Sequence, residues 1–161
     1  MNVEIIAIGN LKEGYLREAE REYLKRLTPY CSVSVTELKE ARLSQNAGLA
    51  EESKIRQTEG AALLAAARKK EGAYVVALDM RGDQLTSEEF ASQLERLALD
   101  GTKAAVFLIG GSLGLPETVR EKADMVLSFS KMTFPHQLMR VILEEQIYRA
   151  YKIRRGEPYH K

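Results

Sequence analysis

The sequence predicts one α/β domain over residues 1–161, with a mostly parallel sheet of five to six strands and helices on both faces. Short apolar runs of strand length alternate with longer amphipathic segments from one end of the chain to the other. This alternation is typical of parallel strands joined by helical crossovers. Ala104–Ile109 is apolar at every position, as expected of a strand covered on both faces. No repeat, linker or low-complexity segment divides the chain.

The first half of the chain is expected to supply two strands and two long helices. Val3–Ile8 is a short apolar strand, and the helix after it must end before Pro29. Cys31–Val35 alternates apolar residues with serines and predicts a half-buried strand. Residues 39–50 are polar without a clear period, and a helix follows to about Lys70. The apolar stripes are Leu16, Ala19, Tyr23 and Leu27 in the first helix, and Ile55, Ala62, Leu63 and Ala66 in the second.

The second half is expected to contain three strands and three helices. Thr86 and Glu89 have the spacing of a capping box and open a helix through Leu97. Pro116 is expected at the first position of a short helix that ends at Lys122. The remaining elements are strands at Tyr74–Leu78, Ala104–Ile109 and Met125–Phe129, and a last helix from His136 to about Lys152.

Composition indicates a soluble globular protein without a membrane segment. The chain is 45% hydrophobic and 29% charged, which is ordinary for such proteins. No apolar run approaches the roughly 20 residues that a spanning helix needs. The N-terminus has no basic segment or small-residue cleavage site, so it is expected to be a strand and not a signal peptide. The single Cys31 favours a buried thiol over a nucleophile, and we expect a cytoplasmic location.

Charge is unevenly distributed along the chain. The net charge is +1, which alone argues against a general nucleic-acid-binding protein. From Arg140 to Lys161 there are six basic and three acidic residues, so this end is positive and the remainder slightly negative. A positive end suits a protein that contacts a polyanion at one place. Cations near a helix C-terminus are also favoured by the helix dipole, so charge alone leaves both interpretations open.

Two loops after predicted strands are candidates for ligand binding, because ligands of parallel sheets collect at the carboxyl ends of the strands. The glycines of Gly110–Gly114 allow backbone amides to approach a ligand closely, although the local sequence alone favours a simple tight turn. Phe129–Phe134 could enclose an adenine with main-chain groups between Phe and Met side chains, or it could fill the core. Leu78 ends a third strand at this rim, and the adjacent Asp79 is a candidate for a ribose hydroxyl or a turn.

The chain ends on Tyr159, His160 and Lys161, which carry a phenol, an imidazole and an ammonium group. These groups can donate, accept or transfer protons, whereas chain ends usually fray into small polar residues. A histidine has its pKa near the working pH and suits general base catalysis. His136, at the start of the last helix, is expected to cap or pack. No His or Cys cluster indicates a metal site.

Three separated blocks resemble the ribosomal RNA large subunit methyltransferase H family, which belongs to the SPOUT class of S-adenosylmethionine-dependent RNA methyltransferases. The blocks are LIGGSLG (Leu108–Gly114), LSFSKMTFPHQLMR (Leu127–Arg140) and RRGEPYHK (Arg154–Lys161). The resemblance runs along the whole chain and is most specific from Leu108 to Lys161. It implies a C-terminal trefoil knot, in which the last helix threads through an earlier loop.

The resemblance also implies the reaction and the cofactor residues, and the chemistry of the tail adds candidate catalytic and RNA-binding residues. The methyl group of S-adenosylmethionine would go to N3 of a pseudouridine in a stem-loop of large-subunit (23S) ribosomal RNA, leaving S-adenosylhomocysteine. His160 would act as the base, and Tyr159 or a cation would stabilise negative charge on the flanking carbonyl oxygens. Arg154, Arg155 and Lys161 are the expected RNA contacts. The cofactor would be bound by Leu78, Gly110, Phe129, Ser130, Lys131, Met132, Thr133 and Phe134.

Assembly and substrate follow the same resemblance. SPOUT enzymes are dimers that build sites across the interface, so we expect a homodimer with the last helix at or near the contact. The small chain has no appended RNA-binding domain, which favours a large preassembled substrate such as a ribosome. Two alternatives are a SPOUT enzyme that acts on transfer RNA and a regulatory domain that binds adenosine without catalysis. The apolar residues expected to supply the interface are Val141, Ile142, Ile147, Tyr148 and Tyr151, of which Ile142 and Tyr148 could also be buried in the monomer.

Overall fold

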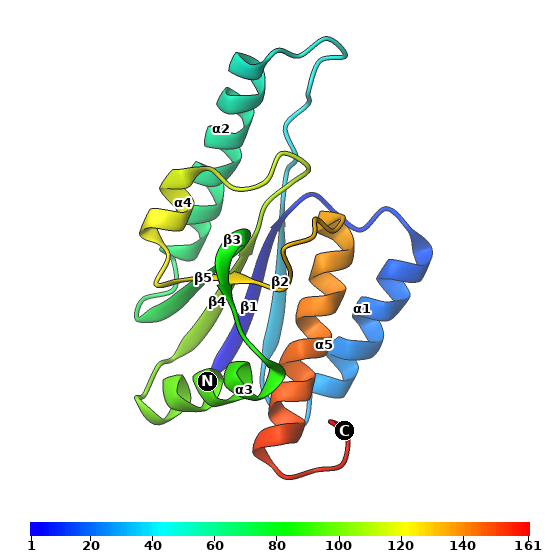
Figure 1. The fold of residues 1–161 in the computed structure, drawn as a ribbon, viewed down its shortest axis with the longest axis vertical. Coiled ribbons are helices and arrows are strands. Elements are labelled where there is room, and N and C mark those ends of the chain that lie inside the picture. The colour runs from blue at the N-terminus through cyan, green and yellow to red at the C-terminus, as the bar shows by residue number, and fades with distance from the viewer.

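The computed structural model describes all residues from Met1 to Lys161 and contains one five-stranded sheet (Figure 1). All neighbouring strands are parallel, in the order β2-β1-β4-β3-β5. The α/β fold class is therefore confirmed, with five strands, and the knot stays a prediction. The strands are β1 (Asn2–Ile8), β2 (Val33–Leu38), β3 (Ala73–Gln84), β4 (Ala104–Ile109) and β5 (Met125–Ser128).

Five helices cover the two faces of the sheet. The helices α1, α3 and α5 pack on one face, and α2 and α4 cover the other (Figure 1). The capping box of α3 is formed as predicted, whereas Pro116 is the N-cap of α4 and not its first helical residue. No helix is long and apolar enough to cross a membrane. The helices are α1 (Gly14–Leu27), α2 (Leu49–Ala67), α3 (Ser87–Leu99), α4 (Glu117–Lys122) and α5 (His136–Arg154).

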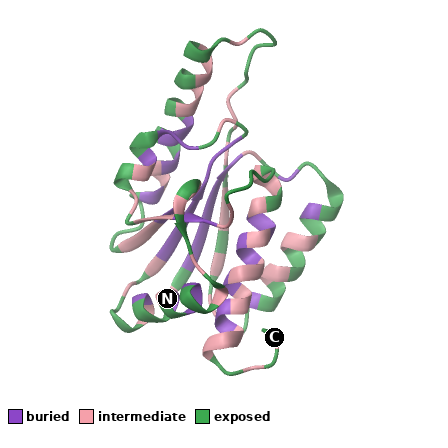
Figure 2. Cartoon of the chain, viewed as in Figure 1, coloured by how far each residue is buried: buried purple, intermediate pink, exposed green.

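The central strands β1 and β4 are mostly buried (Figure 2). Their side chains alternate between two core clusters, one on each face of the sheet. Val3 and Ile5 point to the face covered by α1, α3 and α5, while Ile6 and Ile8 point to α2 and α4. In β4, Phe107 packs on the face of α1, α3 and α5, whereas its neighbours Val106 and Leu108 pack on the face of α2 and α4. This double burial explains why Ala104–Ile109 is apolar throughout.

The predicted apolar stripe of α2 is confirmed at Leu63 and at Ala66, which packs against the core, and is wrong at Ala62. Ala62 is exposed, and the buried residues of the helix are Glu59, Gly60, Leu63 and Ala67. An added Cβ on Gly60 would lie 2.3 Å from Cγ of Pro116, so the helix contacts the chain before α4 through a residue without a side chain. Close approach has replaced a continuous apolar stripe here, and periodicity alone could not show it.

The strand β3 runs well beyond the predicted end at Leu78 and then passes over β5. Its pairing with β5 shifts register between Leu78 and Asp83. At Gly82 the two backbones are so close that an added Cβ would lie 2.5 Å from the carbonyl carbon of Val126. A glycine is required at this crossing because any side chain would overlap the backbone of β5. Leu78, where the pairing of β3 with β4 ends, lies before this crossing at the same rim as the loops after β4 and β5.

Candidate active site

One cavity of about 960 Å³ occupies the rim where the carboxyl ends of β3, β4 and β5 meet. It is lined by residues 78–81 of β3, the loop after β4, the loop after β5 and the first turn of α5. This volume lies in the range of small-molecule sites, which are about 300–1,000 Å³. The rim position of the cavity is the one expected for ligands of parallel sheets.

Seven of the eight predicted cofactor-binding residues lie on the wall of this cavity. They come from β3 and from the loops after β4 and β5, so the fold brings together segments that are up to 56 positions apart in the chain. Lys131 is the exception, because it is exposed and does not line the cavity. The seven residues are Leu78, Gly110, Phe129, Ser130, Met132, Thr133 and Phe134.

The glycine-rich loop after β4 is a tight turn and also a wall of the cavity. Gly111 and Gly114 pair as an antiparallel bridge, with the Gly114 N–H donating to the Gly111 carbonyl at 3.0 Å. Gly114 has a φ of +75°, which favours glycine. Nε of Arg56 in α2 donates to the Leu113 carbonyl at 2.9 Å. The interpretation as a tight turn is therefore confirmed, while ligand binding by the backbone that the turn exposes to the cavity stays a prediction.

The loop after β5 is folded by its own serines. The hydroxyl of Ser128 donates to the carbonyl of Ser130 at 2.9 Å, and the hydroxyl of Ser130 accepts the Met132 N–H at 2.9 Å. The buried Ser128 ends β5, so the loop begins on a rigid element. Met132 is 74% exposed and Phe134 is 37% exposed. These two side chains line the cavity and also extend to the molecular surface, so they are not core residues.

Asp79 lines the cavity with a basic partner that the sequence did not indicate. Its Oδ2 lies 3.3 Å from the guanidinium of Arg120, and its Oδ1 accepts the Arg81 N–H at 2.9 Å. Arg120 also donates to the Leu115 carbonyl at 2.8 Å. The turn interpretation of Asp79 is therefore correct in part, and its carboxylate is held by α4. Arg120 was missed because it lies on a short helix without any binding motif.

His136 is the first residue of α5 and lines the cavity. It does not cap the helix, since Pro135 is the N-cap and makes no side-chain capping bond. Burial lowers the pKa of the imidazole, and the neighbouring Lys12 and Arg140 act in the same direction against Glu40. The expectation that His136 caps or packs therefore missed its position at the cavity wall.

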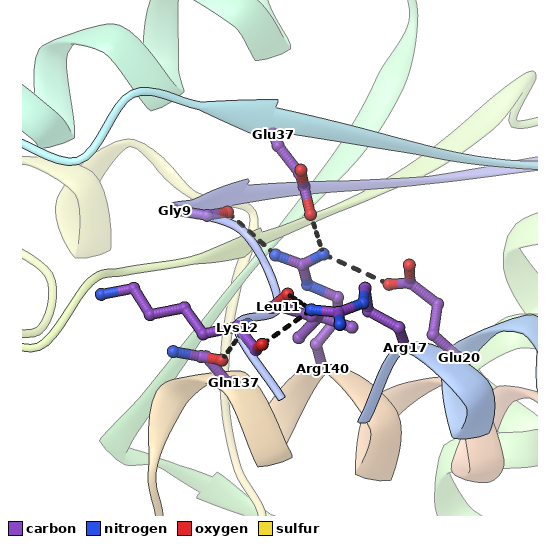
Figure 3. Close-up of polar contacts among 8 residues, drawn as sticks. All are labelled: Gly9, Leu11, Lys12, Arg17, Glu20, Glu37, Gln137 and Arg140. Carbon is purple, nitrogen blue, oxygen red and sulfur yellow. Dashed lines mark hydrogen bonds and ion pairs between the residues drawn. The ribbon is translucent and has the colours of Figure 1, made fainter. Parts of the chain in front are cut away.

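Arg140 anchors the start of α5 to the sheet, one turn after His136 (Figure 3). Its side chain is only 2% exposed, and one guanidinium nitrogen lies 2.6 Å from Glu37 and 3.2 Å from Glu20. The other donates to the Gly9 carbonyl at 3.0 Å. These contacts join the ends of β1 and β2 to α5, and so fix the helix that carries the cavity wall.

Glu144 lies one turn further along α5 and is fully buried. Neither carboxylate oxygen accepts a hydrogen bond from a donor group. Burial raises the pKa of Glu144 to about 9, and the negative charge of Glu20 adds to this increase against Arg140. Glu144 is therefore protonated and neutral at pH 7, while the same residue in an unfolded chain is ionised above about pH 4.5.

We expect Glu144→Gln to be more stable than the natural chain at pH 8 and nearly equal to it at pH 5. Between about pH 4.5 and 9 the folded chain binds a proton at Glu144 that the unfolded chain releases, so the free energy of unfolding falls as pH rises. Glutamine removes this dependence, and the difference at pH 8 should be on the order of a few kcal/mol. Urea unfolding across this range measures it. A difference between the two proteins that does not change with pH contradicts the protonated state.

The C-terminal tail after α5 is ordered on the chain itself. Gly156 has a φ of +62°, and the Glu157 N–H donates back to the Lys152 carbonyl at 3.0 Å, which turns the chain at the end of the helix. The carboxylate of Glu157 then accepts bonds from Lys152 at 2.6 Å and from the Tyr30 hydroxyl at 2.5 Å. The tail therefore needs no partner chain to be held.

The last residues of the tail contact α3 and α5. The Tyr159 hydroxyl donates to Glu145 at 3.0 Å, and the guanidinium of Arg149 lies 4.8 Å from the Tyr159 ring centre. Burial and the Glu145 carboxylate raise the pKa of Tyr159, so its phenol keeps its proton. Nε2 of His160 lies 2.8 Å from Glu88, and Nδ1 lies 3.3 Å from Arg149.

The tail and the cavity lie at opposite ends of α5. The helix has 19 residues and is about 28 Å long at about 1.5 Å per residue. His160 follows its C-terminus, whereas His136 and the cavity are at its N-terminus. The structure therefore does not bring the predicted catalytic residues and the predicted cofactor residues together within one chain.

The three predicted RNA-binding residues lie at the tail end of α5. Nε of Arg154 lies 3.6 Å from Glu95, and the side chain is 20% exposed. Arg155 is exposed, with its guanidinium 4.6 Å from the ring centre of Tyr30. Lys161 is exposed and makes no ion pair. Arg154 is thus partly engaged within the chain, while the other two cations are more available.

Comparisons with known proteins agree on one family. The sequence matches the family described as "Predicted SPOUT methyltransferase" over residues 1–160. It is 50% identical to the ribosomal RNA large subunit methyltransferase H of Carboxydothermus hydrogenoformans and 49% identical to that of Bacillus thuringiensis, and each alignment covers 100% of both chains. The fold resembles the tRNA (m1G37) methyltransferase of Aquifex aeolicus with a TM-score of 0.55 over 92% of this chain and 70% of that chain. Because the identity to that structure is only 11%, it shows the fold alone.

Proposed function

We propose that this chain, which belongs to the SPOUT methyltransferase family, transfers a methyl group from S-adenosylmethionine to large-subunit ribosomal RNA. The observation that carries the proposal is the full-length identity of about one half to large subunit methyltransferases H. The cavity at the rim of the sheet supports it, because two of the three family blocks, in the loops after β4 and β5, line this cavity. The specific atom that we propose as the acceptor of the methyl group is N3 of a pseudouridine.

The residues of the cavity fit S-adenosylmethionine. Its apolar wall suits the uncharged adenine, and the backbone of the loops after β4 and β5 offers donors and acceptors for ring nitrogens and hydroxyls. Cationic Arg56 and Arg81 on the same wall suit the carboxylate of the methionyl part. When bound, the cofactor supplies a sulfonium methyl group, whose transfer leaves a neutral thioether. The apolar wall residues that we propose for the adenosine are Leu78, Ile109, Leu127 and Phe129.

The role that we propose for the tail is acid–base and electrostatic. An imide nitrogen is a poor nucleophile until its proton leaves, and a positioned imidazole can accept this proton. His160 is the candidate base. Tyr159 remains protonated and its hydroxyl is bound to Glu145, so it also holds the tail against α5.

We further propose that the active site is completed by a second copy of the chain. Within one chain the tail is a helix length away from the cavity. His160 can therefore take a proton from a pseudouridine only if that nucleobase lies at the cavity of a partner chain. A two-fold axis beside antiparallel α5 helices would place each tail next to the other cavity. Exposed apolar side chains at the cavity end suit such a contact. These side chains are Tyr15, Met132, Phe134 and Leu138.

This surface differs from the one that the sequence indicated. Val141, Ile147 and Tyr151 are buried within the chain and cannot supply an interface. Ile142 and Tyr148 are half-buried. The apolar content of α5 therefore serves mostly the core between α1, α3 and the sheet.

If the protein is a dimer, light scattering at micromolar concentration should give a mass twice that of one chain, which is 18.1 kDa. Leu138→Asp should produce monomers and abolish methyl transfer, because it places a charge in the apolar contact. Leu99→Asp is the matched control, since Leu99 is 80% exposed at the end of α3 and lies outside this surface. A natural chain that scatters as a monomer would refute the dimer, as would active monomers of the Leu138 variant.

The proposed reaction is tested by radiolabelled methyl transfer to free large subunits, to assembled ribosomes and to transfer RNA. Each ribosomal substrate is prepared with and without prior pseudouridylation. Incorporation that requires large-subunit RNA and pseudouridine supports the proposal. Deleting residues 159–161 separates the enzyme from a domain that only binds adenosine, because that domain would keep its full function without the tail. Methyl label found only on transfer RNA would overturn the proposal that ribosomal RNA is the substrate.

A further inference from the structure

His160 is contacted from two sides by groups of opposite hydrogen-bonding character. Nε2 lies 2.8 Å from Oε1 of Glu88, which is the second residue of α3. Nδ1 lies 3.3 Å from a guanidinium nitrogen of Arg149 in α5. Glu88 and His160 are 72 positions apart in the chain, so only the folded structure reveals this pair.

These two contacts determine where the imidazole carries its proton. A guanidinium has donors only, so the ring nitrogen that faces Arg149 must accept and cannot carry hydrogen. An ionised carboxylate accepts only, so the ring nitrogen that faces Glu88 must donate. Both constraints select the same neutral tautomer, with hydrogen on Nε2 and a free lone pair on Nδ1.

Glu88 is ionised in this arrangement. Its pKa lies below the usual range because its own backbone N–H and then the His160 ring hydrogen-bond to the carboxylate. The residue also lies in the first turn of α3, where the helix dipole favours a negative charge. With 58% of its side chain exposed, Glu88 can follow small movements of the tail and keep the bond.

The contact at Nδ1 is long and can be exchanged. Arg149 already donates hydrogen bonds of 2.7 and 3.1 Å to the carboxylate of Glu145. Its 3.3 Å contact to His160 is therefore the longest of its hydrogen bonds. An N–H donor of a substrate can take the place of this guanidinium without disturbing the bond between Nε2 and Glu88. Nδ1 is then the nitrogen that receives a proton.

We propose that Glu88 is a positioning residue of the methyl transfer, holding Nε2–H of His160 so that Nδ1 faces the substrate as the proton acceptor. This inference rests on the proposed function. In the step, the proton of N3 moves to Nδ1, the N3 lone pair forms the new bond to the methyl carbon, and the bond from that carbon to sulfur breaks. The imidazolium that results keeps its second N–H on the Glu88 carboxylate, which stabilises the positive charge.

Two substitutions of Glu88 and two measurements test this inference. Glu88→Ala should lower kcat by about tenfold, in the range of lost outer-sphere partners, while the KM values for RNA and cofactor stay unchanged. Glu88→Gln keeps an oxygen that can accept from Nε2–H and should recover most of the rate. Asp100→Asn, at the other end of α3, removes the same charge and should behave as the natural chain.

Nuclear magnetic resonance of ¹⁵N-labelled protein observes the ring directly, without any activity. The natural chain and Glu88→Gln should show an exchange-protected Nε2–H signal of His160, which Glu88→Ala should lose. A full kcat in Glu88→Ala, or an unchanged Nε2–H signal in that variant, would overturn the inference. If the natural chain fails to methylate any ribosomal substrate, the proposed function fails, while the ring signal still reports on Glu88.

Discussion

Replacing His160 by alanine should lower the rate of methyl transfer by roughly 10²–10⁴-fold, the usual contribution of a general base. The affinity for S-adenosylmethionine should remain nearly intact, because the residues that we propose to bind the cofactor all line the cavity and none belongs to the tail. Single-turnover kinetics at saturating ribosomal substrate measures the chemical step without product release.

The competing explanation is that the tail only binds RNA through its cations. A loss of ground-state binding raises KM and leaves kcat unchanged, so the variant would recover its full rate at saturating substrate. Such a recovery rules out catalysis by His160. Lys161→Ala provides the contrast, since it should raise KM and leave the saturated rate near that of the natural chain. Tyr159→Phe should cost less than His160→Ala, because it removes one bond to Glu145 and leaves the ring contacts.

Gly110→Val should abolish cofactor binding in a protein that remains folded. An added Cβ at Gly110 would lie 2.8 Å from the backbone of Gly114 and 3.1 Å from Leu115. The valine side chain would therefore overlap the turn. Such overpacking typically costs about 1–3 kcal/mol, and we expect the loop that forms the cavity wall to shift in order to relieve it. We expect calorimetry to show at least about a 100-fold loss of affinity for S-adenosylmethionine, or about 2.7 kcal/mol.

Gly14→Val is the matched control for this substitution. It adds the same atoms at the start of α1, where only a side-chain nitrogen of Arg17 lies within 4 Å. Circular dichroism and thermal unfolding should show that both variants are folded. Unchanged cofactor affinity in a folded Gly110→Val protein would place the cofactor elsewhere.

The sequence predicted the strands of the sheet and its rim because the positions of strands follow from local patterns, whereas the order of the strands was not predicted. The strand Ala104–Ile109 was identified to the residue, since double burial leaves no polar position to confuse its ends. The capping box of α3 is another local signal. The stripe of α2 was wrong at Ala62, and it missed Gly60, which packs against Pro116 through its missing side chain.

Pairs that the fold creates were out of reach of any local pattern. Asp79 and Arg120 are 41 positions apart, and His160 and Glu88 are 72 apart, so neither pair forms a motif. The pairing of Arg140 with Glu37 and Gly9 is equally remote. The one signal for this pairing was the position of Arg140 among apolar residues of the last helix. An arginine buried there needs a charged partner, because burying an unpaired charge is costly.

A mixed dimer of the two inactive variants tests most directly whether the active site combines the cavity of one chain with the tail of another. Gly110→Val and His160→Ala chains are co-expressed with different tags and purified through both tags in turn. One site of the mixed dimer then pairs the intact cavity of the His160→Ala chain with the intact tail of the Gly110→Val chain. We predict methyl transfer at about half the rate of the natural dimer, because one of its two symmetric sites is complete. If cavity and tail act within the same chain, each chain carries one defect, and a mixed dimer as inactive as its parents would contradict the account.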